Sequence, residues 1–260
     1  MRLGRCHESA RGAPRPTLAR HDRVIDVRVG NDGRQVERAF ARAFAALERV
    51  HNAMSLQCVG SDVARFNAAG RGERVVCDRW TVNVLRLAQR LQRASDGLFD
   101  VALGTACGAA FDIVDDRSVR KLGGRIDLGG IAKGYAVDRA VLVLRASGVD
   151  QGLVNAGGDL RAFGAGAWPI EVRSGRGHLR AQMALERGAV ATSQYCNGRS
   201  PHRDDTLIAP ATGAAHAIDN TITVAAPRCV LADALTKVVA LSSNPQHPLL
   251  RELGGQAWLQ

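Results

Sequence analysis

The chain has 260 residues, of which 46% are hydrophobic and 23% are charged, and its formal net charge is +10. This balance indicates a globular protein with a hydrophobic core. The sequence has no apolar run of the length of a membrane span, and its arginines are spread evenly, with no basic segment interleaved with aromatic residues. We therefore expect neither a membrane span nor nucleic-acid binding.

The N-terminal segment is rich in arginine and proline. We expect residues 1–21 to be disordered or loosely attached, and residues 22–260 to form a single domain. As written, the segment has no secretory signal, and no apolar stretch of the lipoprotein type precedes Cys6. The six cysteines show no CxxC or other metal spacing, which favours a reducing compartment. These features predict a cytoplasmic protein, or a copy that lacks its export segment.

Hydrophobic spacing predicts both helices and strands along the chain. Helices are expected at 35–54, shortly after the cap candidates Ser61 and Asp62, and at 80–95, 133–147, 231–241 and 249–253. Strands are expected at 24–29, 125–128, 152–155, 160–163, 168–173, 181–185, 190–192, 221–225 and 256–259. The short turns between the later strands predict an antiparallel meander.

A glycine-rich turn joins a short strand to a helix in the middle of the chain. Residues 125–139 read Arg-Ile-Asp-Leu-Gly-Gly-Ile-Ala-Lys-Gly-Tyr-Ala-Val-Asp-Arg. Glycines let the backbone turn sharply, a helix start favours an anion, and Lys133 adds a point charge. Asp127 offers a carboxylate to a metal or to a polar ligand group. The pattern predicts a phosphate-binding turn; the alternative is a solvated lysine that caps an ordinary strand-to-helix turn.

Lysine is rare in this chain. Of the 35 lysines and arginines, only Lys121, Lys133 and Lys237 are lysines. The presence of lysine rather than arginine at positions 133 and 237 indicates that a compact ammonium is needed there. Because Lys237 follows Asp233 by four residues, the two share one face of the predicted helix. This pair is either an ordinary ion pair within the helix or a cation that points into a cleft.

Six short motifs, taken together and in order, resemble those of the ApbE family of FAD:protein FMN transferases. They lie at residues 95–100, 127–139, 154–159, 191–193, 210–213 and 232–236. The resemblance extends from about residue 24 to the C-terminus. It implies an α+β fold of the ApbE type, which is T-fold-like, with mixed or antiparallel sheets flanked by helices and an FAD cleft between them.

The resemblance also implies an activity. The family uses Mg²⁺ and transfers FMN from FAD to a threonine hydroxyl of a target flavoprotein, releasing AMP. Such phosphoryl transfer depends on positioning and charge neutralisation, and the acceptor supplies the nucleophile. Two alternatives remain: an FAD-binding protein with little or no transferase activity, and an Mg²⁺-dependent FAD pyrophosphatase. Family members are often periplasmic or membrane-anchored.

Site residues follow from the resemblance by position. The residues implied in catalysis are Lys133, Asp233 and Lys237. Those implied in FAD binding are Gln57, Leu98, Phe99, Asp100, Asp127, Lys133 and Ile208. Those implied in metal binding are Gly130, through its carbonyl, with Asp233 and Thr236.

The sequence departs from the family pattern at several of these places. Gln57 stands where an aromatic residue is usual, and Thr206 and Ala209 replace a histidine and an aspartate. Lys237 stands where the family has a metal-binding threonine. We therefore expect either that Thr236 supplies this ligand, or that the Lys237 ammonium lies on the pyrophosphate and partly replaces the ion.

Overall fold

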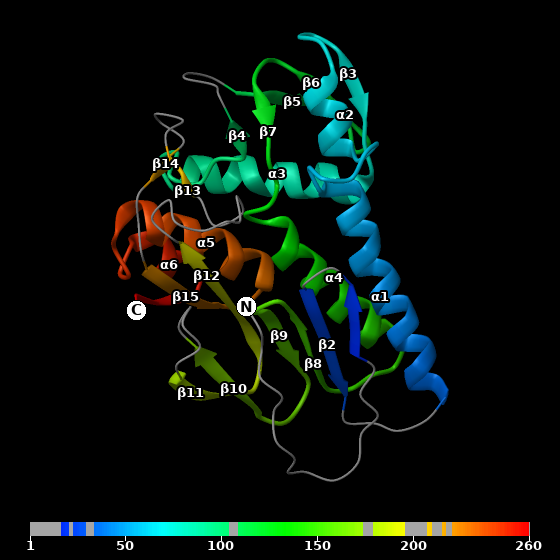
Figure 1. Ribbon diagram of the computed structural model, residues 1–260, viewed down its shortest axis with the longest axis vertical. Coiled ribbons are helices and arrows are strands. Elements are labelled where there is room, and N and C mark those ends of the chain that lie inside the picture. The colour runs from blue at the N-terminus through cyan, green and yellow to red at the C-terminus, as the bar shows by residue number, and fades with distance from the viewer. Residues whose placement is uncertain are drawn as a thin grey trace.

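The computed structural model describes residues 17–20, 23–29, 34–103, 109–173, 179–195, 207–209, 215–216 and 220–259. These residues form an α+β fold in which a seven-stranded sheet packs against helices (Figure 1), which confirms the predicted fold class. The helices are α1 (Arg34–Met54), α2 (Asp62–Ala68), α3 (Arg79–Ala94), α4 (Ala132–Ala146), α5 (Cys229–Ser242) and α6 (Pro248–Glu252). None of these described helices has the length and apolar character needed to cross a bilayer.

The large sheet has the order β1-β2-β8-β9-β12-β15-β16, and each neighbouring pair is antiparallel. Its strands are β1 (Thr17–Arg20), β2 (Arg23–Val29), β8 (Gly152–Ala156), β9 (Asp159–Phe163), β12 (Gly188–Tyr195), β15 (Asn220–Ala226) and β16 (Gln256–Leu259). The strands are antiparallel, as predicted, but the predicted meander is wrong. Strand β12 pairs with β9 and β15, while the strands at Trp168–Arg173 and Leu179–Leu185 pair with each other in a separate two-stranded sheet. Strand β12 is longer than the predicted 190–192, because its pairing with β15 continues through polar residues to Tyr195 opposite Asn220.

Strand β1 lies at one edge of this sheet and pairs with β2. The segment 1–21, expected to be disordered or loosely attached, therefore contains a strand at Thr17–Arg20. Its main-chain pairing, rather than any strong apolar pattern, places it there. Residues 1–16 and 30–33 lie outside the described residues.

Both faces of the large sheet are covered. Helices α4 and α5 pack on one face, and α1 packs on α4. On the other face lies the hairpin β10 (Trp168–Arg173) and β11 (Leu179–Leu185), with a smaller apolar cluster formed by Leu153, Leu160, Ala162, Ile170 and Val190. Successive strand residues point to opposite faces, so strands buried on both sides need apolar residues at adjacent positions.

The remaining elements form a second layer above α4 (Figure 1). Helices α2 and α3 accompany the strands β3 (Arg74–Val76), β4 (Ala102–Leu103), β5 (Phe111–Ile113), β6 (Ser118–Lys121) and β7 (Arg125–Ile126). The Ser61 hydroxyl caps α2, as predicted, and Asp78 caps α3. The stop predicted after α3 is confirmed by Asp96 and Gly97, which have positive φ. A small hairpin joins β13 (Leu207–Ile208) to β14 (Ala215–His216).

Helices α4 and α5 cap each other. Neither begins with a side-chain cap of its own. Asp138 of α4 accepts hydrogen bonds from the main-chain N–H groups of Cys229 and Val230, at 3.0 and 3.1 Å. Asp233 of α5 accepts from the N–H of Gly134, at 3.0 Å. Each carboxylate therefore satisfies N–H groups in the first turn of the other helix.

This reciprocal capping requires the two helices to be in close contact at Gly134. A Cβ at that position would lie 2.3 Å from the carbonyl oxygen of Cys229 and 2.8 Å from Cβ of Asp233. We predict that Gly134→Ala lowers the free energy of unfolding by about 1–3 kcal/mol or more, because neither neighbour can yield without separating the helices. Urea denaturation measures this change.

Gly123→Ala is the matched control, because a Cβ there meets no heavy atom within 4 Å. We expect its unfolding free energy to stay within about 0.5 kcal/mol of the original chain. Equal losses in the two variants would show that the α4–α5 contact is not the cause.

Candidate functional site

Charged and polar side chains gather where the start of α4 meets α5, β9 and β12. The ribbons of these elements meet near the centre of Figure 1. Most of the set was predicted from the sequence and lies in the turn before α4, in the first turn of α4 or on α5. Two further members come from the sheet. The cluster consists of Gly130, Lys133, Asp159, Ser193, Asp233, Thr236 and Lys237.

Asp233 and Lys237 form the ion pair that their spacing predicts. The Lys237 ammonium lies 2.5 Å from Asp233 Oδ1, and it also donates to the main-chain oxygen of Asp233 at 3.1 Å. The carboxylate is fully buried, and its Oδ2 accepts the bond from Gly134. The lysine stem packs beside Gly130, where a Cβ would lie 3.1 Å from Lys237 Cε.

Thr236 directs its hydroxyl toward β12. Its Oγ1 donates to the carbonyl of Asp233 at 2.7 Å and lies 2.8 Å from Ser193 Oγ. The same serine hydroxyl lies 3.5 Å from the Lys237 ammonium. Ser193 therefore links the threonine to the lysine.

Lys133 and Asp159 form a second ion pair. The ammonium lies 3.1 Å from Asp159 Oδ1, yet neither oxygen of this fully buried carboxylate has a partner with hydrogen-bond geometry among the described residues. The tight turn at Gly157 and Gly158, both with positive φ, places Asp159 at the start of β9. A buried carboxylate with so few partners is costly, and this cost favours the protonated form of Asp159.

Burial and the nearby charge of Asp233 raise the pKa of Asp159 to about 7, although Lys133 and Lys237 act in the opposite direction. For Lys237, burial opposes the charged form, but the carboxylate of Asp233 outweighs it and the pKa is raised. The pKa of Lys133 is likewise raised, because Asp159 and Asp233 outweigh burial. Burial works against ionised Asp233 too, but the two lysines lower its pKa. The lysines and Asp233 are therefore charged at neutral pH, while Asp159 is close to its midpoint.

Main-chain groups of the turn are largely engaged. The N–H of Gly129 donates to Asp127 Oδ1 at 2.8 Å, and those of Ile131 and Ala132 donate to the carbonyl of Leu128. The N–H of Gly134 donates to Asp233, so several N–H groups at the start of this helix already have acceptors within the protein. Positive charge for an anion therefore comes mainly from the side chains of Lys133 and Lys237.

The Asp127 main chain is hydrogen-bonded to Val101, the residue that follows the segment 98–100. Its N–H donates to the carbonyl of Val101 at 2.8 Å. Phe99 is buried in the core, whereas Leu98 and Asp100 are partly buried. Phe99 therefore serves the core, and the FAD contacts expected for Leu98, Phe99 and Asp100 stay predictions.

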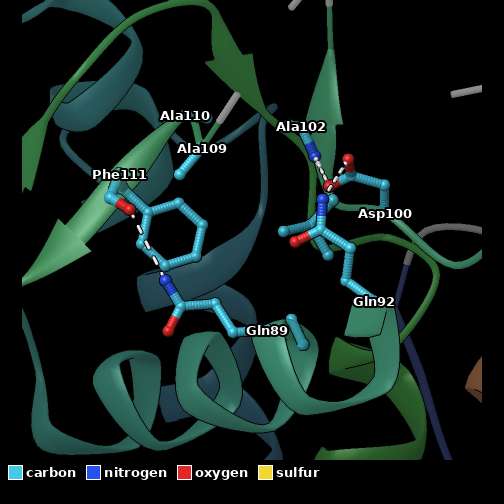
Figure 2. Close-up of a pocket in the computed structure, with 9 residues that line it drawn as sticks. Gln89, Gln92, Asp100, Ala102, Ala109, Ala110 and Phe111 are labelled. Carbon is cyan, nitrogen blue, oxygen red and sulfur yellow. Dashed lines mark hydrogen bonds between the residues drawn. The ribbon is translucent and has the colours of Figure 1, made fainter. Parts of the chain in front are cut away.

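Asp100 lines a small pocket between α3 and the strands β4 and β5, and Figure 2 shows Gln89 and Gln92 reaching into it from α3. Gln92 donates to Asp100 Oδ2 at 2.6 Å, and the N–H of Ala102 donates to Oδ1 at 2.8 Å (Figure 2). Burial raises the pKa of Asp100. The carboxylate is thus held in place by its own neighbours.

Two further predicted FAD contacts lie in a loop and in a short strand. Gln57 is exposed in the loop after α1, where its N–H donates to Ser55 Oγ at 3.2 Å. Ile208 is partly buried in β13, paired with β14. No contact recorded for the described residues joins either one to the lysines, so both roles stay predictions. Thr206 lies outside the described residues.

Asp159, Ser193 and Asp138 were not predicted as site residues. The first two lie in motifs at 154–159 and 191–193 that the sequence does display. An aspartate that follows two glycines at the start of an apolar strand was the available signal for Asp159. Nothing local in the sequence indicates that Asp138 caps a helix that begins at Cys229.

Comparisons with known proteins identify the family of the chain. A model of the ApbE family matches residues 22–112 and 106–254. The chain is 28% identical over 275 residues to an FAD:protein FMN transferase of Treponema pallidum (strain Nichols), covering 85% of this chain and 76% of the relative. It is also 28% identical over 231 residues to an FAD:protein FMN transferase of Vibrio cholerae, covering 73% of this chain and 69% of the relative.

Solved structures show the same fold. The ApbE protein of Thermotoga maritima matches with a TM-score of 0.78 at 22% identity, covering 95% of this chain and 94% of that one. The flavin transferase ApbE from Vibrio cholerae matches with a TM-score of 0.74 at 20% identity, covering 94% and 92%. The resemblance read from the sequence is confirmed: because the family model matches most of its length, the chain belongs to the ApbE family.

Proposed function

We propose that this chain is an FAD:protein FMN transferase, which moves FMN from FAD to a threonine hydroxyl of an acceptor flavoprotein and releases AMP. Family membership and the names of the two relatives support this activity. Within the molecule, the observation that carries it is the pair of ammoniums, Lys133 and Lys237, at the junction of α4 and α5. Two fixed cations suit the two phosphates of FAD.

The chemistry asks little covalent help from the enzyme. The acceptor oxygen forms a bond to the phosphorus of the FMN half, the bond from that phosphorus to the AMP phosphate breaks, and the hydroxyl proton is released. Lys133, with 32% of its side chain exposed, is the more accessible cation, and Lys237 keeps 18% exposed. Both neutralise charge that builds on the phosphates during transfer.

Magnesium was expected on Gly130, Asp233 and Thr236, and oxygens of suitable type do lie there. In this arrangement, however, Asp233 Oδ1 carries the Lys237 ammonium, Oδ2 accepts from Gly134, and Thr236 donates to the main chain. Among the described residues, no group of three His, Cys, Asp or Glu side chains is placed to hold a metal. The residues as placed do not fit the ion, and no step here depends on it; a requirement for Mg²⁺ stays a prediction.

The activity is tested by incubating the chain with FAD, Mg²⁺ and a threonine-containing acceptor domain. We expect mass spectrometry to find FMN bound covalently to the acceptor, with one AMP released for each FMN attached. FAD binding without AMP would indicate the binding protein instead. AMP and free FMN formed without any acceptor would indicate the pyrophosphatase.

Lys133→Met tests the role of the more exposed ammonium. We expect FAD affinity to fall by about tenfold or more, because a charged contact to phosphate is lost. The variant also leaves Asp159 without its ion-pair partner, so its stability should fall as well.

The double variant Lys133→Met with Asp159→Asn separates these effects. Both charges of the pair are removed, so we expect stability to recover while FAD affinity stays low. Recovery of both quantities would show that Lys133 serves only to neutralise Asp159. Fluorescence titration of FAD and urea denaturation supply the two measurements.

The pKa of Asp159, about 7, predicts how FAD binding depends on pH. Bound phosphates add negative charge beside Lys133, Lys237, Asp233 and Asp159, and so favour protonated Asp159. Binding then takes up a proton, and affinity falls as the pH rises through about 7. Asp159→Asn should flatten this profile, and an unchanged profile would assign the dependence to another group.

The same carboxyl affects stability without any ligand. Its pKa is 3.8 without the fold and about 7 within it, so the native state binds more protons between these values. The free energy of unfolding should therefore decrease as the pH rises from about 4 to about 7, and less so in Asp159→Asn.

A further inference from the structure

Lys237 occupies the oxygens on which a metal ion was expected. Its ammonium lies 2.5 Å from Asp233 Oδ1, 3.1 Å from the main-chain oxygen of Asp233 and 3.5 Å from Ser193 Oγ. Carboxylate, carbonyl and hydroxyl oxygens are the ligand types that Mg²⁺ takes in proteins. The ammonium therefore stands on a set of oxygens that would suit a divalent cation.

The lysine stem takes the adjacent space. It passes beside Gly130, at the 3.1 Å approach given above, and so lies between two of the expected metal ligands, Gly130 and Asp233. The other oxygen of Asp233 is bonded to the N–H of Gly134. A metal ion can reach this carboxylate only after the ammonium leaves it.

Departure of the ammonium is unfavourable. Asp233 and Asp159 are both fully buried, and each raises the other's electrostatic cost, as the pKa of Asp159 shows. Without Lys237, the Asp233 carboxylate would lack its only ion-pair partner among the described residues. An uncompensated buried charge destabilises a fold strongly, so the fold itself holds the lysine in place.

We propose that Lys237 is a covalently attached cation that replaces a divalent ion on Asp233 and faces a phosphate of FAD, so that this chain binds FAD without a metal at this position. The identity of the ligand rests on the proposed function. The claim about the cation does not, because it concerns which positive charge Asp233 carries.

The first test compares FAD binding in EDTA and in excess Mg²⁺. For the original chain we expect less than about a twofold difference. For Lys237→Thr we expect affinity in EDTA to fall by roughly tenfold to a hundredfold, and to return with Mg²⁺, because the shorter side chain frees Asp233 Oδ1. The proposal is overturned if EDTA weakens binding to the original chain as much as it weakens binding to Lys237→Thr.

The second test needs no flavin. Mn²⁺ serves as the probe in electron paramagnetic resonance, and thermal unfolding is followed with and without Mg²⁺. We expect Lys237→Thr to bind Mn²⁺ and to be stabilised by Mg²⁺, or to fold only with Mg²⁺, while the original chain does neither. Equal Mn²⁺ binding by the two proteins would contradict the proposal.

Two controls locate the ion. Asp233→Asn with Lys237→Met removes both charges of the pair, so it should fold without Mg²⁺ and bind no Mn²⁺. Arg145→Thr removes an exposed cation from α4 and should behave like the original chain. Mn²⁺ binding by the double variant as tight as that of Lys237→Thr would place the ion away from Asp233 and overturn the proposal. If no form binds FAD, the proposed function fails, but Mn²⁺ binding still decides the claim about Lys237.

Discussion

Reciprocal capping of helices α4 and α5, in which an aspartate of each helix binds N–H groups at the start of the other, is the interaction on which the site depends. Asp138 satisfies the first N–H groups of α5, and Asp233 satisfies one at the start of α4. Neither helix supplies its own cap, so each one begins correctly only when the other is in place. The absence of a side chain at Gly134 lets them approach closely enough. Because Lys133 and Lys237 sit beside these same contacts, the geometry of the cations is set by the way the helices are capped.

Charge balance explains how the site tolerates burial. Two carboxylates, Asp159 and Asp233, face two ammoniums, Lys133 and Lys237, so the cluster is neutral when all four are ionised. Such a cluster does not hold an anion by net charge alone. The acids are fully buried while the side chains of both lysines remain partly exposed, so the positive charges are the more accessible ones. Protonation of Asp159 removes one negative charge and makes the net charge of the cluster positive.

Much of the fold and part of the site were predictable from the sequence. Amphipathic periodicity located α1 and α3, and the Asp233–Lys237 spacing predicted an ion pair that the structure contains. Residues whose roles depend on distant partners were not predictable in this way. Burial and the nearby Asp233 of α5 raise the pKa of Asp159, and Asp138 caps a helix far along the chain. Strand β12 is longer than its apolar segment for the same reason, because its length is set by pairing with β15 and not by the character of its side chains.

The contact between Gly134 and Asp233 spans 99 positions of the sequence. During synthesis the glycine turn and Asp159 leave the ribosome well before α5 does. The cluster that contains Asp159 and Lys133 therefore stays incomplete until α5 has been made. Contacts between residues so far apart in the sequence form late in folding, because the entropy of loop closure is lost before the contacts contribute favourable energy. A nascent or C-terminally truncated chain therefore lacks the Asp233–Lys237 pair, and the charged cluster is assembled only when the fold is completed.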